Sequence, residues 1–281
     1  MREKTSKRPR AFKDIETEQE LADYLDNPYF GNHVPSLYHY TKLSTVVDII
    51  KSGYWHLTTA EQKNDYLEYE NGDKEAWKSL FFTCFMSEDA ESIAMWSMYA
   101  QPWDDGVKIR IGLKEVREWM KTIKSVAIID EKTWQATGNL LPVSQENIKL
   151  SGVAYINTEN ENEQVLKFGN QENNRIQYIP KSATLTGYIK DSAWSYEKEL
   201  RLKVRVYNED NKIKRIGLPI DNLINNMEIS AGPMFKGNLK ERLFNEIHRQ
   251  VKLNKSYFTG KLNIKNPCDD CKAKKQTETE H

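Results

Sequence analysis

Cysteine, net charge and long hydrophobic runs are scarce or absent in this sequence. Three cysteines among 281 residues are too few for a disulfide scaffold. The 41 basic residues are balanced by 41 acidic ones, so the basic excess typical of nucleic-acid-binding proteins is missing, although local basic patches remain compatible with this balance. No apolar stretch approaches the roughly 20 residues of a membrane span, and the N-terminus has no hydrophobic segment of the signal-peptide type. We therefore expect a cytoplasmic protein with no membrane partner.

Standard cofactor and metal motifs are missing too. The sequence contains no GxxxxGK(S/T), GxGxxG, HExxH or GxSxG segment. Cys268 and Cys271 form an isolated CxxC, and no second cysteine or histidine pair follows to complete a structural zinc site. Cys84 lies in the apolar run LFFTCFM, where we expect a small buried hydrophobic residue. We expect no bound metal, and any functional site must be assembled from distant segments.

The chain is long enough for one large domain, and its seven Trp and 14 Tyr supply bulky side chains for a core. Residues 1–13 are strongly basic and are expected to form a disordered arm. Residues 14–260 are expected to form a single α+β domain, closed by an amphipathic helix at 238–254. Residues 261–281 are expected to form a flexible polar tail.

Hydrophobic periodicity predicts a mixture of strands and helices without a regular βαβ repeat. Such a mixture favours an α+β fold with a bent or split, mostly antiparallel sheet and flanking helices. Strands are predicted at 37–40, 54–59, 79–86, 106–113, 125–130, 153–156, 193–207 and 226–233. Helices are predicted at 41–52, ended by Gly53, and at 60–77, 91–100, 114–124 and 238–254, with 157–174 as a mobile insertion.

The first candidate site is His39-Tyr40-Thr41, where a predicted strand meets a predicted helix. A histidine in this place can donate or accept a hydrogen bond at the edge of a cleft. The alternative is that Thr41 merely caps the helix and His39 is a structural residue.

The second candidate is WSYEKELR, at 194–201. Glu197 and Glu199 are two residues apart on a predicted strand, so both point to its polar face, and Arg201 follows on the same face. A carboxylate there can stabilise the positive charge that develops at a carbon during glycosidic cleavage. The alternative is a solvated face, whose charge pairs contribute little to stability.

Two further groups of residues each have two possible roles. Asn64, Asp65 and Glu68 share one face if their segment is helical, where they would bind a polar ligand or a cation, or cap the helix. Trp96 and Tyr99 are spaced to share a helix face, as a base-stacking platform or, more often for such pairs, as part of the core.

Four segments, taken in order, resemble the bacterial family known as domain of unknown function 2971. They are LYHYTKLSTVVDIIKSGYW at 37–55, NDYLE at 64–68, CFMSEDAESIAMWSMY at 84–99 and WSYEKELR at 194–201. The resemblance covers roughly residues 36–235. The family name itself carries no activity.

The strand that ends in His-Tyr-Thr, the helix after it and the later Glu-bearing strand also resemble, more distantly, the ADP-ribosyltransferases. That resemblance implies a split antiparallel sheet that binds NAD as substrate. It implies that His39, with Tyr40 and Thr41 beside it, contacts a ribose and that Glu197 or Glu199 is catalytic. An aromatic residue would stack on nicotinamide, with Tyr66, Tyr69 and Tyr99 as candidates. The residues assigned to target binding or to support of the site are Asn64, Asp65, Glu68, Trp96 and Arg201.

The leading hypothesis from the sequence is therefore an NAD-dependent ADP-ribosyltransferase-like enzyme that modifies a nucleic acid or a protein, in the manner of a toxin or a phage-defence effector. The first alternative is a binding module without catalysis, which recognises a nucleotide, a nucleic acid or a partner protein. The second is a nuclease that uses Mg²⁺ with Asp65, Glu68 and one glutamate of the 197/199 pair.

Overall fold

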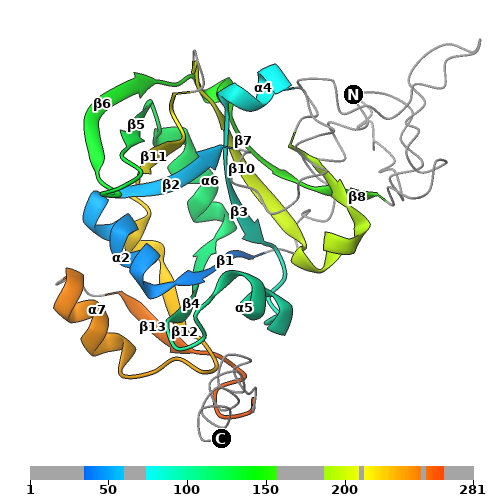
Figure 1. Ribbon diagram of the computed structural model, residues 1–281, viewed down its shortest axis with the longest axis vertical. Coiled ribbons are helices and arrows are strands. Elements are labelled where there is room, and N and C mark those ends of the chain that lie inside the picture. Colours follow the sequence, from blue (N-terminus) through cyan, green and yellow to red (C-terminus); the bar gives the residue numbers. More distant parts are fainter. Residues whose placement is uncertain (1–34, 60–73, 157–186, 209–211, 248–250, 263–281) are drawn as a thin grey trace, which may run out of the picture.

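The computed structural model describes residues 35–59, 74–156, 187–208, 212–247 and 251–262, and Figure 1 shows their arrangement. They form an α+β fold with one large, mostly antiparallel sheet and few helices, as the sequence predicts. The predicted basic arm, the polar segment 60–73, the insertion at 157–174 and the tail beyond 262 lie outside the described residues. No helix within the described ranges is long and apolar enough to cross a membrane.

The strands in chain order are β1 (Ser36–Lys42), β2 (Tyr54–Thr59), β3 (Leu80–Met86), β4 (Gly106–Gly112), β5 (Ser125–Ile129), β6 (Ala136–Pro142), β7 (Ile148–Gly152), β8 (Ala154–Ile156), β9 (Ile189–Asp191), β10 (Glu199–Arg205), β11 (Arg215–Pro219), β12 (Glu228–Ala231) and β13 (Lys252–Lys255). The α-helices are α2 (Leu43–Ser52), α4 (Lys74–Ser79), α5 (Ile93–Tyr99), α6 (Leu113–Thr122) and α7 (Leu239–Ile247). Short 3-10 helices are η3 (Gln145–Asn147), η4 (Ser192–Glu197) and η6 (Ile224–Asn226).

The large sheet has the strand order β13-β12-β4-β1-β3-β2-β11-β5-β6, with β10 added to β3 and β7 added to β10. Every pair in it is antiparallel except β12 with β13. Strands β8 and β9 form a separate parallel pair. Figure 1 shows β10 beside β3, with β8 farther out on the same side.

The sheet is split at β3. One edge of β3 pairs with β10 along its whole length, from Leu80 to Met86. The other edge is shared, because β1 pairs only at Met86 and β2 pairs only at Phe81 and Phe82. Strands β1 and β2 therefore diverge from each other, and residues 83–85 face the gap between them. The ADP-ribosyltransferase resemblance implied a split antiparallel sheet, and the structure has one.

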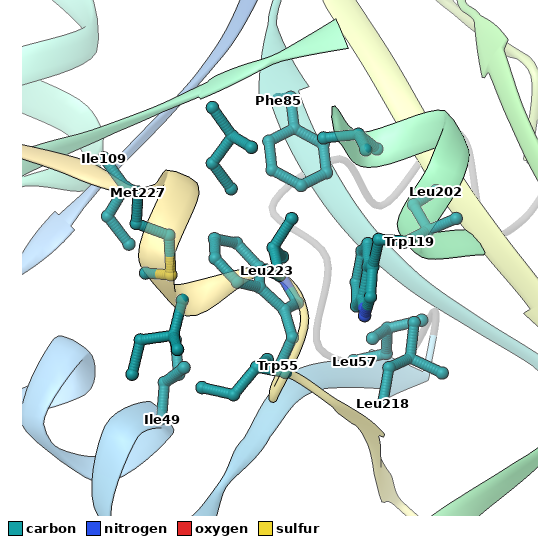
Figure 2. Close-up of a cluster of buried hydrophobic side chains, with 14 of the residues drawn as sticks. Ile49, Trp55, Leu57, Phe85, Ile109, Trp119, Leu202, Leu218, Leu223 and Met227 are labelled. Atoms are coloured by element: carbon teal, nitrogen blue, oxygen red, sulfur yellow. The ribbon is translucent and has the colours of Figure 1, made fainter. Parts of the chain in front are cut away.

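The connection from β1 to β2 follows the predicted pattern. In α2 the apolar positions recur at helical spacing and are all buried. Gly53 ends the helix in the left-handed conformation, with φ of 75°, and its N–H donates to the carbonyl of Ile49 at 3.1 Å. Figure 2 shows the core beneath this unit, where Trp55 and Phe85 point into one cluster with Leu202, Trp119 and Leu218. Each such side chain contributes about 1.5–3 kcal/mol of burial free energy, so the core fixes where β1, β2 and β3 lie.

Several predicted boundaries are wrong. Thr41 does not open α2; it is a buried residue of β1, and the N-cap is Lys42, which makes no side-chain cap hydrogen bond. The predicted closing helix does not reach residue 254, because Lys252–Lys255 forms β13 on the edge of β12, which offers a row of backbone partners. Alternation along the predicted strand 106–113 puts Lys108 on its outward face, but the residue is buried, because Glu91 pairs with its amine at 2.8 Å.

Strands β6, β7, β9 and β11 are not among the predicted elements. Strand β6 is largely exposed, and β7, β9 and β11 have only three to five residues, too few for apolar alternation to mark them as strands. Strands β7, β9 and β11 pair with strands that are distant in the sequence, whereas β6 pairs with the adjacent β5. Strand β11 fills the space between β2 and β5.

Candidate active site

A cleft of about 330 Å³ lies at the split of the sheet. Its walls come from β1, β2 and β3 around the gap, from α5 and β10 on one side and from β11 and the β5–β6 turn on the other. Most of the lining is aromatic or apolar, with a few ionisable groups. The polar and aromatic residues that matter below are Tyr38, His39, Tyr40, His56, Cys84, Tyr99, Trp134, Lys190, Glu197, Glu199, Arg201 and Arg215.

His39 is fixed by contacts on three sides. Its Nδ1 lies 2.8 Å from the carbonyl oxygen of Cys84, across the gap between β1 and β3. A carbonyl only accepts, so Nδ1 carries the proton and donates this bond. The ring meets the edges of Trp55 and Phe85, with centroids 5.3 and 5.9 Å apart. His39 is thus a rigid, half-buried group in the wall of the cleft. Cys84 itself is half-buried and not the fully buried residue that was expected, because its strand borders the gap.

Glu197 and Glu199 both line the cleft, but they do not lie on one strand as predicted. Glu197 is the last residue of η4, and Glu199 is the first residue of β10. Between them Lys198 adopts the left-handed conformation, with φ of 45°. The chain turns at this residue from the 3-10 helix into the strand, and both carboxylates still enter the same buried cluster.

The carboxylates are paired with two buried cations. Arg201 donates from Nε to Oε1 of Glu199 at 2.7 Å and from Nη2 to Oε2 at 3.0 Å, a two-point contact. Its Nη1 donates to the carbonyl of Gly187 at 2.8 Å. Lys190 lies 2.6 Å from Oε2 of Glu197 and 3.6 Å from Oε2 of Glu199. These four side chains are at most 7% exposed, which excludes the solvated face considered from the sequence.

The pKa values of Glu197, Lys190 and Tyr99 are shifted by burial and by the charges of their neighbours in this cluster. Burial and the negative charge of Glu199 raise the pKa of Glu197, while Lys190 and a hydrogen bond from Tyr99 oppose that rise. Burial alone would lower the pKa of Lys190, but the two glutamates raise it above its usual range, so the amine stays charged. The Tyr99 hydroxyl donates to Oε1 of Glu197, and burial together with the Glu197 charge raises the pKa of Tyr99. The donor and the acceptor therefore keep their roles at neutral pH.

The other residues singled out from the sequence divide between the cleft and the core. Tyr40 lines the cleft, and its hydroxyl accepts a hydrogen bond from the backbone N–H of Ser92 at 3.3 Å. Trp96 is fully buried, packs edge-on against Tyr40 at 4.8 Å and does not line the cleft, so it is a core residue and not a stacking platform. Thr41 is buried in β1 and is not part of the lining either.

Tyr66, Tyr69, Asn64, Asp65 and Glu68 lie outside the described residues. The predicted roles of these residues stay predictions, including the acidic residues of the nuclease alternative. In the part of the chain that the structure describes, no group of three or more His, Cys, Asp and Glu side chains is arranged to hold a metal ion.

The cleft residues that the sequence did not single out as site residues include His56, Trp134, Lys190 and Arg215. His56 lies on β2, on the same face as Thr58, and no motif around it marks it as a site residue. Lys190 precedes the WSYEKELR segment, but nothing local shows that its amine reaches Glu197. Trp134 and Arg215 are brought together by the pairing of β11 with β2 and β5, which no short motif reveals.

His56 should make stability depend on pH. Burial, with a smaller effect of Arg215, lowers the pKa of His56 from 6.5 to about 4. Between these two values the unfolded chain binds a proton that the folded chain refuses, so stability is lost as pH falls below 6.5. We expect wild type to lose about 2 kcal/mol more than His56→Gln between pH 7.5 and pH 5. Urea unfolding of both proteins at the two pH values measures this difference, and parallel losses would contradict it.

Comparison with known proteins adds a family match. Residues 95–202 match the family model described as "Protein of unknown function (DUF2971)". The resemblance to this family that the sequence motifs indicated is confirmed over that range. The DUF2971 match includes Tyr99, Glu197, Glu199 and Arg201 and leaves out His39 and Arg215. No curated protein matches the chain.

Three solved structures of one protein are similar to this chain, all of DarT from Thermus sp. 2.9. The complex with NAD⁺ has a TM-score of 0.35 at 10% identity and covers 80% of this chain and 96% of that one. The complex with ADP-ribosylated ssDNA has a TM-score of 0.35 at 9% identity, covering 79% and 94%. The complex with carba-NAD⁺ has a TM-score of 0.33 at 8% identity, covering 80% and 97%.

Proposed function

We propose that this protein is an NAD-dependent ADP-ribosyltransferase whose site is the cleft at the split of the sheet. One observation carries the proposal: His39 from β1, Tyr99 from α5 and the Glu197/Glu199 pair line the same cleft although they are far apart in the sequence. The motif resemblance assigns ribose contact to His39 and catalysis to Glu197 or Glu199, and Tyr99 is one of its three candidates for aromatic stacking. The target that receives ADP-ribose is a nucleic acid or a protein, as in a toxin or a phage-defence effector.

The proposed reaction breaks the bond between C1′ of the ribose and the nicotinamide nitrogen. The electron pair of that bond neutralises the positive ring, and nicotinamide leaves as a neutral molecule. Positive charge develops on the ribose, and an acceptor atom of the target then bonds to C1′ and loses a proton. A carboxylate that is already fixed beside C1′ stabilises this charge without reorganising, which is the main source of rate enhancement in such sites.

Each cleft residue has a role in this scheme. Glu199 supplies the fixed negative charge, since Arg201 holds both of its oxygens in place. Glu197 contacts the ribose hydroxyls or the acceptor from the adjacent position. Tyr99 packs beside the nicotinamide ring and orients Glu197 through its hydroxyl. His39, held by the carbonyl of Cys84, contacts a ribose hydroxyl at the gap between β1 and β3.

Nicotinamide release from NAD by the purified wild-type protein, with a chelator present, tests the proposal. We expect release that is time-dependent, saturable in NAD and unaffected by the chelator. Binding of NAD without any release would favour the binding module instead. Activity that requires added Mg²⁺ and cuts nucleic acid would favour the nuclease. A protein that neither binds nor cleaves NAD would exclude the proposal.

Tyr99→Phe should shift the acidic limb of the pH–rate profile. The ionised form of Glu197 is disfavoured by burial and by Glu199, so the limb lies above the usual pKa of a glutamate. The Tyr99 hydroxyl stabilises that ionised form, and its removal raises the pKa further. We expect the limb for nicotinamide release to move up by about half a unit to one unit. Tyr196→Phe is the control, because its hydroxyl lies on η4 without a hydrogen bond to Glu197 in the described structure. A limb that stays in place, or moves to lower pH, would contradict this role of Tyr99.

A further inference from the structure

The end of the cleft opposite the glutamates contains a cation, Arg215, that forms no ion pair with any of the described residues. Arg215 lies on β11, opposite Thr58 of β2, and its guanidinium carbon is 3.5 Å from the ring centroid of Trp134. In the described part of the chain, Arg215 forms no ion pair, and its buried Nε makes no hydrogen bond. The other two cations of the cleft, Lys190 and Arg201, are both neutralised by glutamates. Arg215 is therefore the cation in this cleft that an anionic ligand would pair with.

Trp134 is held in place for this contact. It lies in the turn between β5 and β6 and has a φ of 59°, a left-handed conformation that costs a residue with a bulky side chain about 1–3 kcal/mol. The turn is tied by Asp130, whose Oδ1 accepts from the N–H groups of Lys132 at 3.0 Å and Thr133 at 2.8 Å. The N–H of Trp134 also donates to the carbonyl of Asp130 at 2.9 Å. These bonds keep the ring over the guanidinium despite the backbone strain.

His56 completes the same end of the cleft without adding charge. Its ring stacks on Trp134 with centroids 5.7 Å apart, and its Nε2 lies 3.0 Å from the hydroxyl of Ser52. Its Nδ1 is buried and has no hydrogen-bond partner among the described residues. Its lowered pKa keeps the ring neutral at pH 7, and the negative charges of Glu131 and Asp48 act on Arg215 without forming an ion pair with it in the described part of the chain. Three elements thus converge on one half-buried, positively charged group.

We propose that Arg215, stacked on Trp134, binds a phosphate oxygen of the diphosphate of the dinucleotide substrate. This inference rests on the proposed function, because it places the diphosphate at one end of the cleft and the positive nicotinamide ring near the glutamates at the other. A planar guanidinium matches phosphate oxygens in a two-point contact, and a partly desolvated guanidinium gains more from an anion than an exposed one does. Neutral His56 can add a hydrogen bond without repelling or attracting the rest of the ligand.

Calorimetric titration with ADP-ribose, which has the diphosphate but lacks nicotinamide, tests the inference. Wild type is compared with Arg215→Gln and with Arg117→Gln, which removes the same charge from an exposed position on α6. We expect Arg215→Gln to weaken binding roughly 10- to 100-fold, and Arg117→Gln to leave it unchanged. The loss should shrink at high salt. Equal affinity of all three proteins, or failure of wild type to bind ADP-ribose, would overturn the inference.

The same proteins separate this inference from the proposed function. If wild type binds ADP-ribose through Arg215 but releases no nicotinamide from NAD, the phosphate contact stands and the enzymatic proposal fails. If wild type releases nicotinamide and Arg215→Gln does so with an unchanged KM, the enzyme stands and the phosphate contact fails. Thermal unfolding of each variant shows that the effect on binding is not a loss of fold.

Trp134 is a positioning residue in this scheme, and two variants test it. Trp134→Ala should weaken ADP-ribose binding nearly as much as Arg215→Gln does, because the guanidinium loses the surface that orients it. The double variant should bind no more weakly than the weaker single variant, since both remove one shared interaction. Trp134→Phe should restore most of the affinity. Full affinity in Trp134→Ala, or additive losses in the double variant, would show that Trp134 does not act through Arg215.

Discussion

Glu199→Gln is expected to reduce nicotinamide release from NAD by roughly 10²- to 10³-fold, while affinity for NAD changes much less. Glutamine keeps the size of the side chain and an oxygen that accepts from Arg201, but it removes the fixed negative charge. That charge is needed most when positive charge has developed on the ribose, so its loss affects the rate more than binding. Single-turnover release and equilibrium binding measure the two effects separately.

Two comparisons make this result specific. Glu197→Gln should have a smaller effect, because the Glu197 carboxylate is shared between Tyr99 and Lys190 and its ionised form is disfavoured by burial. Glu228→Gln changes the same residue type in a pair with Arg110, on β12 and away from the cleft lining, and should leave release unchanged. Full activity in Glu199→Gln would remove this residue from the reaction.

Arg201→Met is expected to destabilise the fold by about 3–5 kcal/mol, the usual cost of breaking a buried ion pair. The Arg201 side chain is fully buried, and its guanidinium lies 5.8 Å from the ring of Phe82. Without it, two buried carboxylates share one cation, Lys190, and the carbonyl of Gly187 loses a donor. Urea unfolding measures the loss. Arg205→Met, at the half-buried end of the same strand, should cost clearly less.

The double variant Glu199→Met/Arg201→Met distinguishes charge pairing from packing. It removes both members of one pair and leaves Lys190 with Glu197, so the remaining cluster is neutral. It should therefore be more stable than Arg201→Met alone, and it should be inactive, since the fixed carboxylate is gone. A double variant that is less stable than both single variants would show that the arginine stabilises the fold mainly by packing.

Local signals in the sequence predicted much of the scaffold around the cleft. The helical spacing of α2, the glycine that ends it and the apolar run of β3 are all properties of a few adjacent residues. They were sufficient to predict the unit of β1, α2 and β2. Alternation along β10 puts Leu200, Leu202 and Val204 on one apolar face, and all three lie in the core.

The same alternation could not show that the charged face of β10 is buried. The same Glu-x-Arg spacing is compatible with a solvent-exposed strand face and with a buried cluster of ion pairs. Burial here depends on Lys190 and Gly187, which supply a cation and a carbonyl from a separate segment. The left-handed Lys198, which ends the 3-10 helix before the strand, has no signal of the kind that glycine gives. Trp134 and Arg215 meet only because β11 inserts between β2 and β5, so their contact is a property of the fold alone.

The central claim is that NAD binds in the cleft between β1 and β2 with its reactive bond beside Glu199. A crystal structure of the wild-type protein with a non-hydrolysable NAD analogue tests this claim most directly. The claim predicts the nicotinamide ribose within hydrogen-bond distance of Glu199 or Glu197, a ribose hydroxyl in contact with His39, and the nicotinamide ring beside Tyr99. An analogue bound elsewhere on the protein, or an empty cleft at saturating analogue concentration, would contradict it.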